Sequence, residues 1–505
     1  MRRGNKVLAS LLAGAWIAAP PAAADTLRQA LSSAYRTSPT LTAAQASQRA
    51  TDEEVPIARA AGLPSVGVNG GYVNNPFGSS NTLASPTQQA TGQATVTVPV
   101  YTGGLVRSTV RAAQTRVEAG QIGLRGTETT LFTAVVTVYM NAIRDEAIVG
   151  LNQQNVHVLD VNLQATRDRF QVGDLTRTDV AQSEARLSLA RAQLQSAQAN
   201  LISSREDYIR VVGTAPGLLE PPPVLPHLPA SPDAAVEIAL RDNPTLLAYQ
   251  KQREASGYDV AAARARRAPQ VNAVLGGNYY NYLGSLGAGT GVPVGQDSLS
   301  ATVGATINLP IFSGGAVSAA IRRAQAQRSA AIEQATDAER SVVATTRAAY
   351  AVWRSSEQVI QSSQEAASAN RLSLEGVRAE NSVGSRTILD ILNAEQELLN
   401  SQVTLVTAQR DAYVAGFALL AAMGQAQADQ LGLDGGPLYD PVVHYASVRH
   451  RVFGVGDDVG VGAKGTTTVK TPAQNANLSK PLDPSLDTPV DTNPHLTTGE
   501  HAPSR

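Results

Sequence analysis

Two long stretches of this chain carry the same motifs in the same order, about 210 residues apart. The segment VPVYTGG at 98–104 returns as LPIFSGG at 309–315, an offset of 211 residues. The offset is 205 residues between Pro64 and Pro269, so it changes only in the segment that follows Pro64. A fixed long period indicates one structural unit that is built twice, and a segment that absorbs an insertion is a surface loop. The offset of 211 continues through Tyr139/Tyr350, Glu184/Glu395 and Gly213/Gly424.

The first 24 residues have the pattern of a secretory signal peptide. Basic residues at positions 2, 3 and 6 precede an apolar run at 7–19, and Ala22-Ala23-Ala24 provides a small-residue cleavage site. This pattern predicts a signal peptide over 1–24. The alternative is a membrane anchor, but the run is shorter than the roughly 20 residues that a spanning helix needs.

Composition narrows the class of protein. The chain has no cysteine, which excludes disulfides and a lipid anchor on cysteine. A net charge of −1 argues against an electrostatic nucleic-acid binder. Hydrophobic residues make up 43% of the chain, but aromatic residues only 4%, which suits long, closely packed helices better than a bulky globular core.

Helical patterns of unusual length follow each Gly-Gly pair. The predicted helices are 38–62, 105–171 and 174–212 in the first repeat, and 243–267, 316–382 and 385–423 in the second. At ~1.5 Å per residue they run about 35, 100 and 60 Å. A short helix stacked end to end on a medium one could therefore lie beside the long one. Helices of this length indicate coiled-coil walls.

These patterns divide the chain into five regions. The signal peptide precedes a first repeat at 25–214. A linker at 215–232, with seven prolines, separates it from a second repeat at 233–424. The remainder, 425–505, is predicted to be a C-terminal segment that continues, beyond about residue 459, as a disordered tail rich in Thr, Pro, Asn and Ser.

Four segments alternate apolar and polar residues with the period of a strand. They are 65–72, 95–100, 271–279 and 299–309. A membrane-spanning strand needs about 9–11 residues, which is close to these lengths. Four strands cannot close a barrel, and an open sheet in lipid leaves edge groups unpaired. Further copies of the chain would therefore have to complete the barrel. Two copies give eight strands and a lumen filled with side chains, whereas three give twelve strands and leave room for a pore.

The hairpin turns resemble those of a known family. The segments VGDLTRTDV at 172–180 and VGSRTILDIL at 383–392, with the Gly-Gly strand ends, are similar to TolC-like outer-membrane channels. The likeness runs in order from about residue 25 to 424, and a segment at 439–449 resembles the C-terminal block of one subgroup. The missing cysteine favours the unlipidated branch of the family.

The resemblance implies a membrane α+β fold. Each chain would contribute four strands to a trimeric twelve-stranded β-barrel in the outer membrane, which a long α-helical coiled-coil barrel continues across the periplasm. It implies an exit duct of a tripartite efflux or type I secretion system, a passive conduit for drugs or secreted proteins. The partners would be a periplasmic adaptor (membrane fusion protein) and an inner-membrane ABC or proton-driven transporter. The residues alone leave one alternative, a secreted coiled-coil structural or filament protein whose strands only cap the helices.

The resemblance also implies a pore entrance. Asp390 matches an aspartate that lines the constricted entrance in the family, so that carboxylates from several copies would converge on one axis and attract cations. The alternative is a helix-start aspartate that stabilises the first turn. A second family aspartate is replaced here by Asn393, which predicts a less negative entrance.

Further positions match a gate and a docking tip in the family. Arg386, Asp179 and Thr178 match a network that holds the entrance closed, and Asn381 stands where the family has a tyrosine. The alternative is ordinary surface charge. The turns Val172-Gly173 and Val383-Gly384 are predicted to contact the adaptor. Helix reversal alone would also require their glycines.

Nothing in the sequence indicates an enzyme. None of the six histidines has metal-ligand spacing in a predicted folded element. The Gly-Gly pairs lack the Lys-Ser/Thr of a phosphate loop. We therefore expect neither a cofactor nor a metal.

Overall fold

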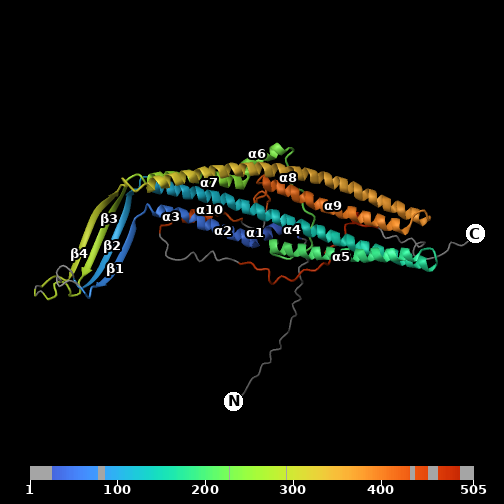
Figure 1. The fold of residues 1–505 in the computed structure, drawn as a ribbon, viewed down its shortest axis with the longest axis horizontal. Coiled ribbons are helices and arrows are strands. Elements are labelled where there is room, and N and C mark those ends of the chain that lie inside the picture. Colours follow the sequence, from blue (N-terminus) through green and yellow to red (C-terminus); the bar gives the residue numbers. More distant parts are fainter. Residues whose placement is uncertain are drawn as a thin grey trace, which may run out of the picture.

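The computed structural model describes residues 25–77, 86–226, 228–289, 291, 293–432, 438–452 and 465–488. The molecule is long and narrow, with strands at one end and helical hairpins at the other (Figure 1). The predicted signal peptide, parts of both predicted loops, and residues 459–464 and 489–505 of the predicted tail lie outside the described residues.

Four strands form one antiparallel sheet in sequence order. They are β1 (Ser65–Asn74), β2 (Gln88–Tyr101), β3 (Gln270–Asn281) and β4 (Asp297–Asn308). The pairing of β2 with β3 joins the two repeats, with Val96 opposite Leu275, and β1 and β4 are the two edges of the sheet. All four predicted strands are present. β2 starts seven residues before its predicted start at 95, because its polar first half pairs on both sides without showing clear alternation.

Two helices of 67 residues form the length of the molecule. α4 (Leu105–Gln171) and α8 (Ala316–Ser382) have the predicted bounds. Each follows a glycine in the left-handed region, Gly104 and Gly315, both with φ of 85°. Only glycine adopts this backbone conformation without strain, so the Gly-Gly pairs set the bend between sheet and helix.

The predicted helix at 38–62 is divided in the structure. α2 (Pro39–Asp52) and α3 (Glu54–Ala60) meet at Glu53. Pro56 is the reason, because it offers no N–H to the carbonyl of Asp52 and its ring clashes there. Its counterpart α7 (Pro244–Ala265) has alanine at the equivalent position and is continuous.

Two short helices were not predicted. α1 (Leu27–Thr37) and α6 (Pro232–Asp242) open the two repeats. The signals were present, since Thr26 and Gln29 form a capping box and Ser231 caps the helix at Pro232. α6 thus takes the last residue of the predicted linker.

The medium helices complete two hairpins. α5 (Arg177–Val212) and α9 (Ile388–Ala422) begin three residues later than predicted, because Thr176 and Thr387 are their N-caps. α10 (Pro441–Val448) and a 3₁₀ turn, η1 (Pro484–Leu486), follow. None of the described helices has a stretch long and apolar enough to cross a membrane.

The helices form a row in the order α5, α4, α9, α8 (Figure 1). α2, α3 and α5 pack end to end along α4, and α7 and α9 do so along α8. This confirms the predicted stacking of a short and a medium helix beside each long one. α7 also packs against α4, which binds the two repeats together.

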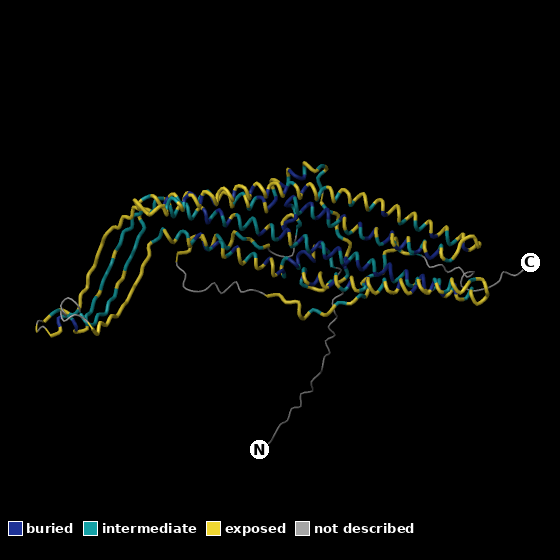
Figure 2. Tube along the Cα trace, viewed as in Figure 1, coloured by how far each residue is buried: buried dark blue, intermediate teal, exposed yellow. Residues whose placement is uncertain are grey.

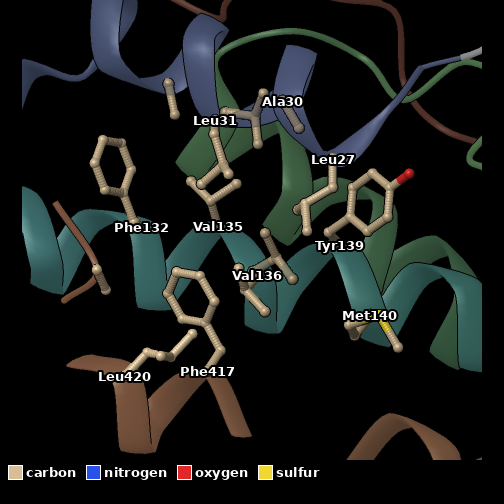
Figure 3. Close-up of a cluster of buried hydrophobic side chains, with 14 of the residues drawn as sticks. Leu27, Ala30, Leu31, Phe132, Val135, Val136, Tyr139, Met140, Phe417 and Leu420 are labelled. Carbon is tan, nitrogen blue, oxygen red and sulfur yellow. The ribbon is translucent and has the colours of Figure 1, made fainter. Parts of the chain in front are cut away.

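The largest core lies where α1, α4 and α9 meet. Phe132, Tyr139 and Phe417 are at most 2% exposed there (Figure 3). Buried residues follow the middle of the helical row, whereas the strands carry none (Figure 2). Large apolar side chains of the edge strands are open, among them Val68 at 77%, Leu299 at 81% and Val303 at 82%.

The prediction of a disordered tail is wrong for residues 465–488, which we term the C-terminal strap. Leu478 packs on a cluster between α4 and α5, and Leu482 and Leu486 pack on one between α4 and α9. Their spacing of four residues was hidden in a segment that composition alone marks as disordered. The strap crosses the whole helical row.

Candidate functional site: the hairpin tips and the strap

Both hairpin turns lie at the end of the molecule opposite the sheet (Figure 1). Gly173 and Gly384 have φ of 89° and 81°, and a Cβ at either would meet open space. Val172 and Val383 beside them are 65% and 79% exposed. The glycines are therefore required for helix reversal, and the valines are accessible to a partner. Both interpretations of these turns remain compatible with the geometry.

Asp390 lies in a capping box at the start of α9. The backbone N–H and the hydroxyl of Thr387 donate to its Oδ2 at 2.9 and 2.7 Å. These bonds to the backbone N–H and to the hydroxyl, in that order, hold the pKa of Asp390 below its usual range. The carboxylate is therefore charged at neutral pH, and within one chain it has the helix-start role given above as the alternative. Asp179 makes the same box with Thr176 at the start of α5.

Arg386 bonds within its own hairpin. Its Nε donates to Glu380 Oε2 at 2.7 Å, and both side chains are about half exposed. Asn381 is buried, and its Nδ2 donates to the carbonyl of Arg386 at 2.7 Å. Two predicted gate residues thus come together on one hairpin, whereas Asp179 and the exposed Thr178 lie on the other.

Asn393 links the two hairpins near the tip. The Nη2 of Arg186 on α5 donates to its Oδ1 at 2.7 Å. The sequence analysis missed Arg186, because nothing in the local pattern marks it. The amide at 393 therefore has a structural partner in addition to its predicted place at the entrance.

A buried ion pair behind the tip was also missed. Arg378 Nη2 lies 3.1 Å from Glu395 Oε1, with side chains 14% and 3% exposed. Asn162 on α4 donates to both oxygens of Glu395, at 2.8 and 3.0 Å. The cluster joins α4, α8 and α9. A signal existed, because Glu395 repeats Glu184 at the offset of 211.

The strap forms a second polar cluster on the four helices. Arg205 on α5 donates to the carbonyl of Asn475 at 2.7 Å and to Ser479 Oγ at 3.0 Å. Glu146 on α4 accepts the N–H of Ser479 and lies 3.7 Å from Arg205. Both charged side chains are less than 10% exposed. The buried ion pair therefore joins α5 to α4, and the strap binds to both of its members.

Farther along, the strap reaches the second hairpin. Gln154 on α4 donates to the carbonyl of Thr488 at 2.7 Å, and Gln402 on α9 to that of Leu486 at 2.9 Å. Arg371 on α8 donates to the carbonyl of Ser485 at 2.6 Å. One segment thus contacts all four helices of the row.

The described part of the chain contains no group of three or more His, Cys, Asp or Glu side chains that could hold a metal ion.

The chain thus combines a sheet that has two open edges and exposed apolar side chains with a helical wall about 100 Å long. The family described as "Outer membrane efflux protein" matches residues 30–214 and 235–425. The chain belongs to this family.

Relatives at the level of sequence cover most of the chain. The outer membrane efflux protein BepC of Brucella suis is 32% identical over 453 residues, which are 88% of this chain and 95% of BepC. TolC of Escherichia coli is 26% identical, over 79% of this chain and 82% of TolC. The alkaline protease secretion protein AprF of Pseudomonas aeruginosa is 27% identical over 57% of this chain and 60% of AprF.

Solved structures share the fold. CusC superposes with a TM-score of 0.68 at 17% identity, over 79% of this chain and 92% of CusC. VceC of Vibrio cholerae gives a TM-score of 0.67 at 21% identity, over 79% of this chain and 96% of VceC. The arrangement of long hairpins and a small sheet is therefore common to these proteins.

Proposed function

We propose that three copies of this outer-membrane exit duct close a twelve-stranded β-barrel, which their helices continue as a tube through the periplasm. The protein lies in the outer membrane and extends into the periplasm, as its family does. The single observation that carries the trimer is the open sheet. β1 and β4 are edge strands with exposed apolar side chains.

Edge strands in lipid must find partners. Each unpaired N–H or C=O in hydrocarbon costs several kcal/mol, so an open sheet does not persist there. β4 of one copy can pair with β1 of the next, as β2 pairs with β3 within the chain. Twelve strands leave an open lumen, whereas eight do not.

The proposed cargo is drugs or secreted proteins. BepC is named as an efflux protein, whereas AprF is named for the secretion of a protease. The chain itself would be passive. A periplasmic adaptor would contact the exposed valines of the tips, and an inner-membrane ABC or proton-driven transporter would supply the energy.

We place the gate at the tips. Three Asp390 carboxylates, each already ionised by its capping box, would form a negative ring. Arg386 donates a hydrogen bond to Glu380, which raises the pKa of Arg386, and its charge would hold the neighbouring helices of the gate together.

Planar-bilayer recording tests this function. Purified protein should insert, migrate as a heat-sensitive oligomer and conduct ions, and Arg386→Ser should raise the conductance. Arg354→Ser is the matched control, because Arg354 also pairs with a glutamate close to it in sequence, Glu357, but lies far from the tip. Conductance that stays at the control value would remove Arg386 from the gate, and a monomer without conductance would refute the duct.

A further inference from the structure

A cavity of about 310 Å³ lies between the strap and the helical row. Its walls come from α4, α9, the proline-rich linker and the strap. The linker contributes Pro221 and Pro222, and the strap contributes Leu478, Leu482 and Leu486. Ligand sites in proteins commonly have volumes of about 300–1,000 Å³. The cavity is therefore large enough for a small ligand, and the strap forms one of its walls.

Most of this wall is apolar. α4 contributes Met140, Ile143 and Ala147, and α9 contributes Val406 and Tyr413. Ligand pockets typically combine such a lining with a small number of polar groups that fix the orientation of the ligand. The apolar part of the wall suits an aliphatic chain.

The charged side chains on the wall carry an excess of positive charge. Three are cations, Arg144, Arg410 and Lys480, and two are carboxylates, Glu146 and Asp483. Both carboxylates already have partners. Glu146 belongs to the buried ion pair that binds the strap, and Asp483 accepts the backbone N–H two residues after it at 2.8 Å. An additional anion would therefore be attracted to this wall, whereas an additional cation would not.

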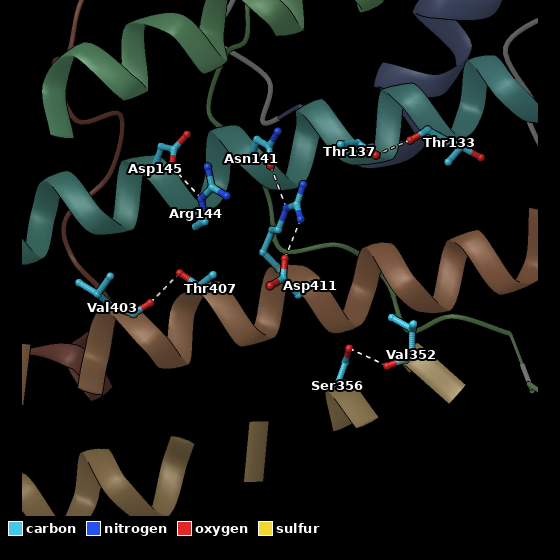
Figure 4. A network of polar contacts seen from close by, with 11 residues as sticks. Thr133, Thr137, Asn141, Arg144, Asp145, Val352, Ser356, Val403, Thr407 and Asp411 are labelled. Carbon is cyan, nitrogen blue, oxygen red and sulfur yellow. Dashed lines mark hydrogen bonds and ion pairs between the residues drawn. The ribbon is translucent and has the colours of Figure 1, made fainter. Parts of the chain in front are cut away.

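The two arginines are held in place by bonds on and between α4 and α9. Arg410 reaches from α9 to α4, where its Nε donates to Asn141 Oδ1 at 2.8 Å, and its Nη1 donates to Asp411 at 2.6 Å (Figure 4). Arg144 pairs with Asp145 at 2.7 Å. A guanidinium has five N–H donors. Both arginines therefore keep donors for a further acceptor without leaving their present positions.

Lys480 brings a cation to the cavity from the strap. Its Nζ donates to the carbonyl of Leu219 in the linker at 3.5 Å, which is a long hydrogen bond. An ammonium has three donors, and the side chain is half-buried at the edge of the apolar wall. Lys480 is thus placed to bind the head group of a ligand whose chain lies among the apolar residues.

We propose that this cavity binds an amphiphile with one short aliphatic chain and one anionic head group, the head group at Lys480 and the chain along α4 and α9. At roughly 30 Å³ for each water-sized group, a cavity of about 310 Å³ holds about ten such groups. That volume fits a single short chain and excludes a phospholipid with two long chains. A fatty acid and a monoalkyl phosphate share this chemistry. The ligand would contact strap, linker and helices together, so its binding would hold the strap on the row.

Hydrogen exchange tests the site on the full chain in discs of neutral phosphatidylcholine, with decanoate as the probe. A ligand that binds only the closed form lowers the open population by a factor of 1 + [L]/Kd. At about ten times its Kd, decanoate should therefore slow exchange of the peptide that covers 474–488 about tenfold. Decanol has the same chain without the charge and should leave the rate unchanged. Decyl phosphate distinguishes the two sources, because equal slowing indicates any anionic head group and slowing by decanoate alone indicates a carboxylate.

Variants locate the ligand. Lys480→Met removes the charge at nearly constant length and should abolish most of the slowing. Lys470→Met is the matched control, because Lys470 is an exposed lysine of the same strap that does not line the cavity. Ala147→Leu fills the cavity without changing a charge and should also abolish the slowing. Each variant is compared with and without decanoate, so a change in its own strap stability cancels.

Three results would overturn the site. Decanoate that leaves the strap peptide unchanged would show that no such ligand binds. Decanol that slows exchange as strongly as decanoate would show that charge has no part in binding. Full slowing in Lys480→Met or in Ala147→Leu would place the amphiphile elsewhere on the protein.

Discussion

Removing Glu146 should release the strap from the helical row. Arg205 and Glu146 are each less than 10% exposed and lie 3.7 Å apart. Breaking a buried pair by removing one partner costs about 3–5 kcal/mol, because the other charge is left unpaired. Arg205 keeps two bonds to the strap, to Asn475 and Ser479. We therefore expect the lower end of this range for Glu146→Ala.

The lost stabilisation should appear as local detachment of the strap from the helices. When the strap detaches, Arg205 is solvated, so the penalty acts on the closed state alone. A loss of about 3 kcal/mol raises the open population about 100-fold, because each 1.4 kcal/mol is a factor of ten. Amide hydrogen exchange reports such local opening directly. The peptide that covers 474–488 should exchange about 100-fold faster in Glu146→Ala than in the unmodified protein.

The neighbouring glutamate supplies the control. Glu206 accepts the N–H of Gln474 at 3.0 Å but is exposed. Its loss should cost about 0.5–1.5 kcal/mol, which is at most about a tenfold change. Exchange in Glu146→Ala that is no faster than in Glu206→Ala would refute the buried pair as the anchor of the strap.

Three further substitutions have expected outcomes. Burial raises the pKa of Glu128 to about 7 in the folded protein. The contribution of Glu128 to stability is therefore greatest at acidic pH and falls as the pH rises toward 7. Glu128→Gln should flatten this part of the decline in thermal melts at graded pH. Asn393→Asp should increase cation selectivity in single-channel recording, and an unchanged reversal potential would show that position 393 does not face the pore. Arg378→Ala leaves Glu395 buried without its cation and should weaken the tip by about 3–5 kcal/mol, which protease cleavage at the α8–α9 turn would report.

Long elements were predictable because one physical rule decides them. A long stretch without proline that follows a Gly-Gly pair predicts the bounds of α4 and α8, and both bounds agree with the structure to the residue. Period-two alternation located all four strands. The break at Glu53 was also readable in principle, since Pro56 cannot continue a helix from the preceding turn. The second repeat has no proline at the equivalent position, so a prediction that assumes the same helix in both repeats misses the break.

The site was less accessible, because its contacts join segments distant in sequence. Asp390 and Asp179 could be placed at helix starts from the Thr-x-x-Asp spacing. Arg186, which bonds Asn393 from 207 residues away, has no local signature. Tertiary contacts between charged residues depend on which helix faces meet, and periodicity alone does not specify the partner.

The strap shows how composition misleads when few residues carry the energy. Thr, Pro, Asn and Ser dominate the segment, yet three leucines, four backbone carbonyls and Ser479 make its main contacts with the row. It also breaks the symmetry of the duplicated chain. The strap bridges α4 and α9, which bind it through Gln154 and Gln402. Their repeats, α8 and α5, stand at opposite ends of the row and have no such bridge between them in the described part of the chain, because a duplicated chain still has only one C-terminal segment.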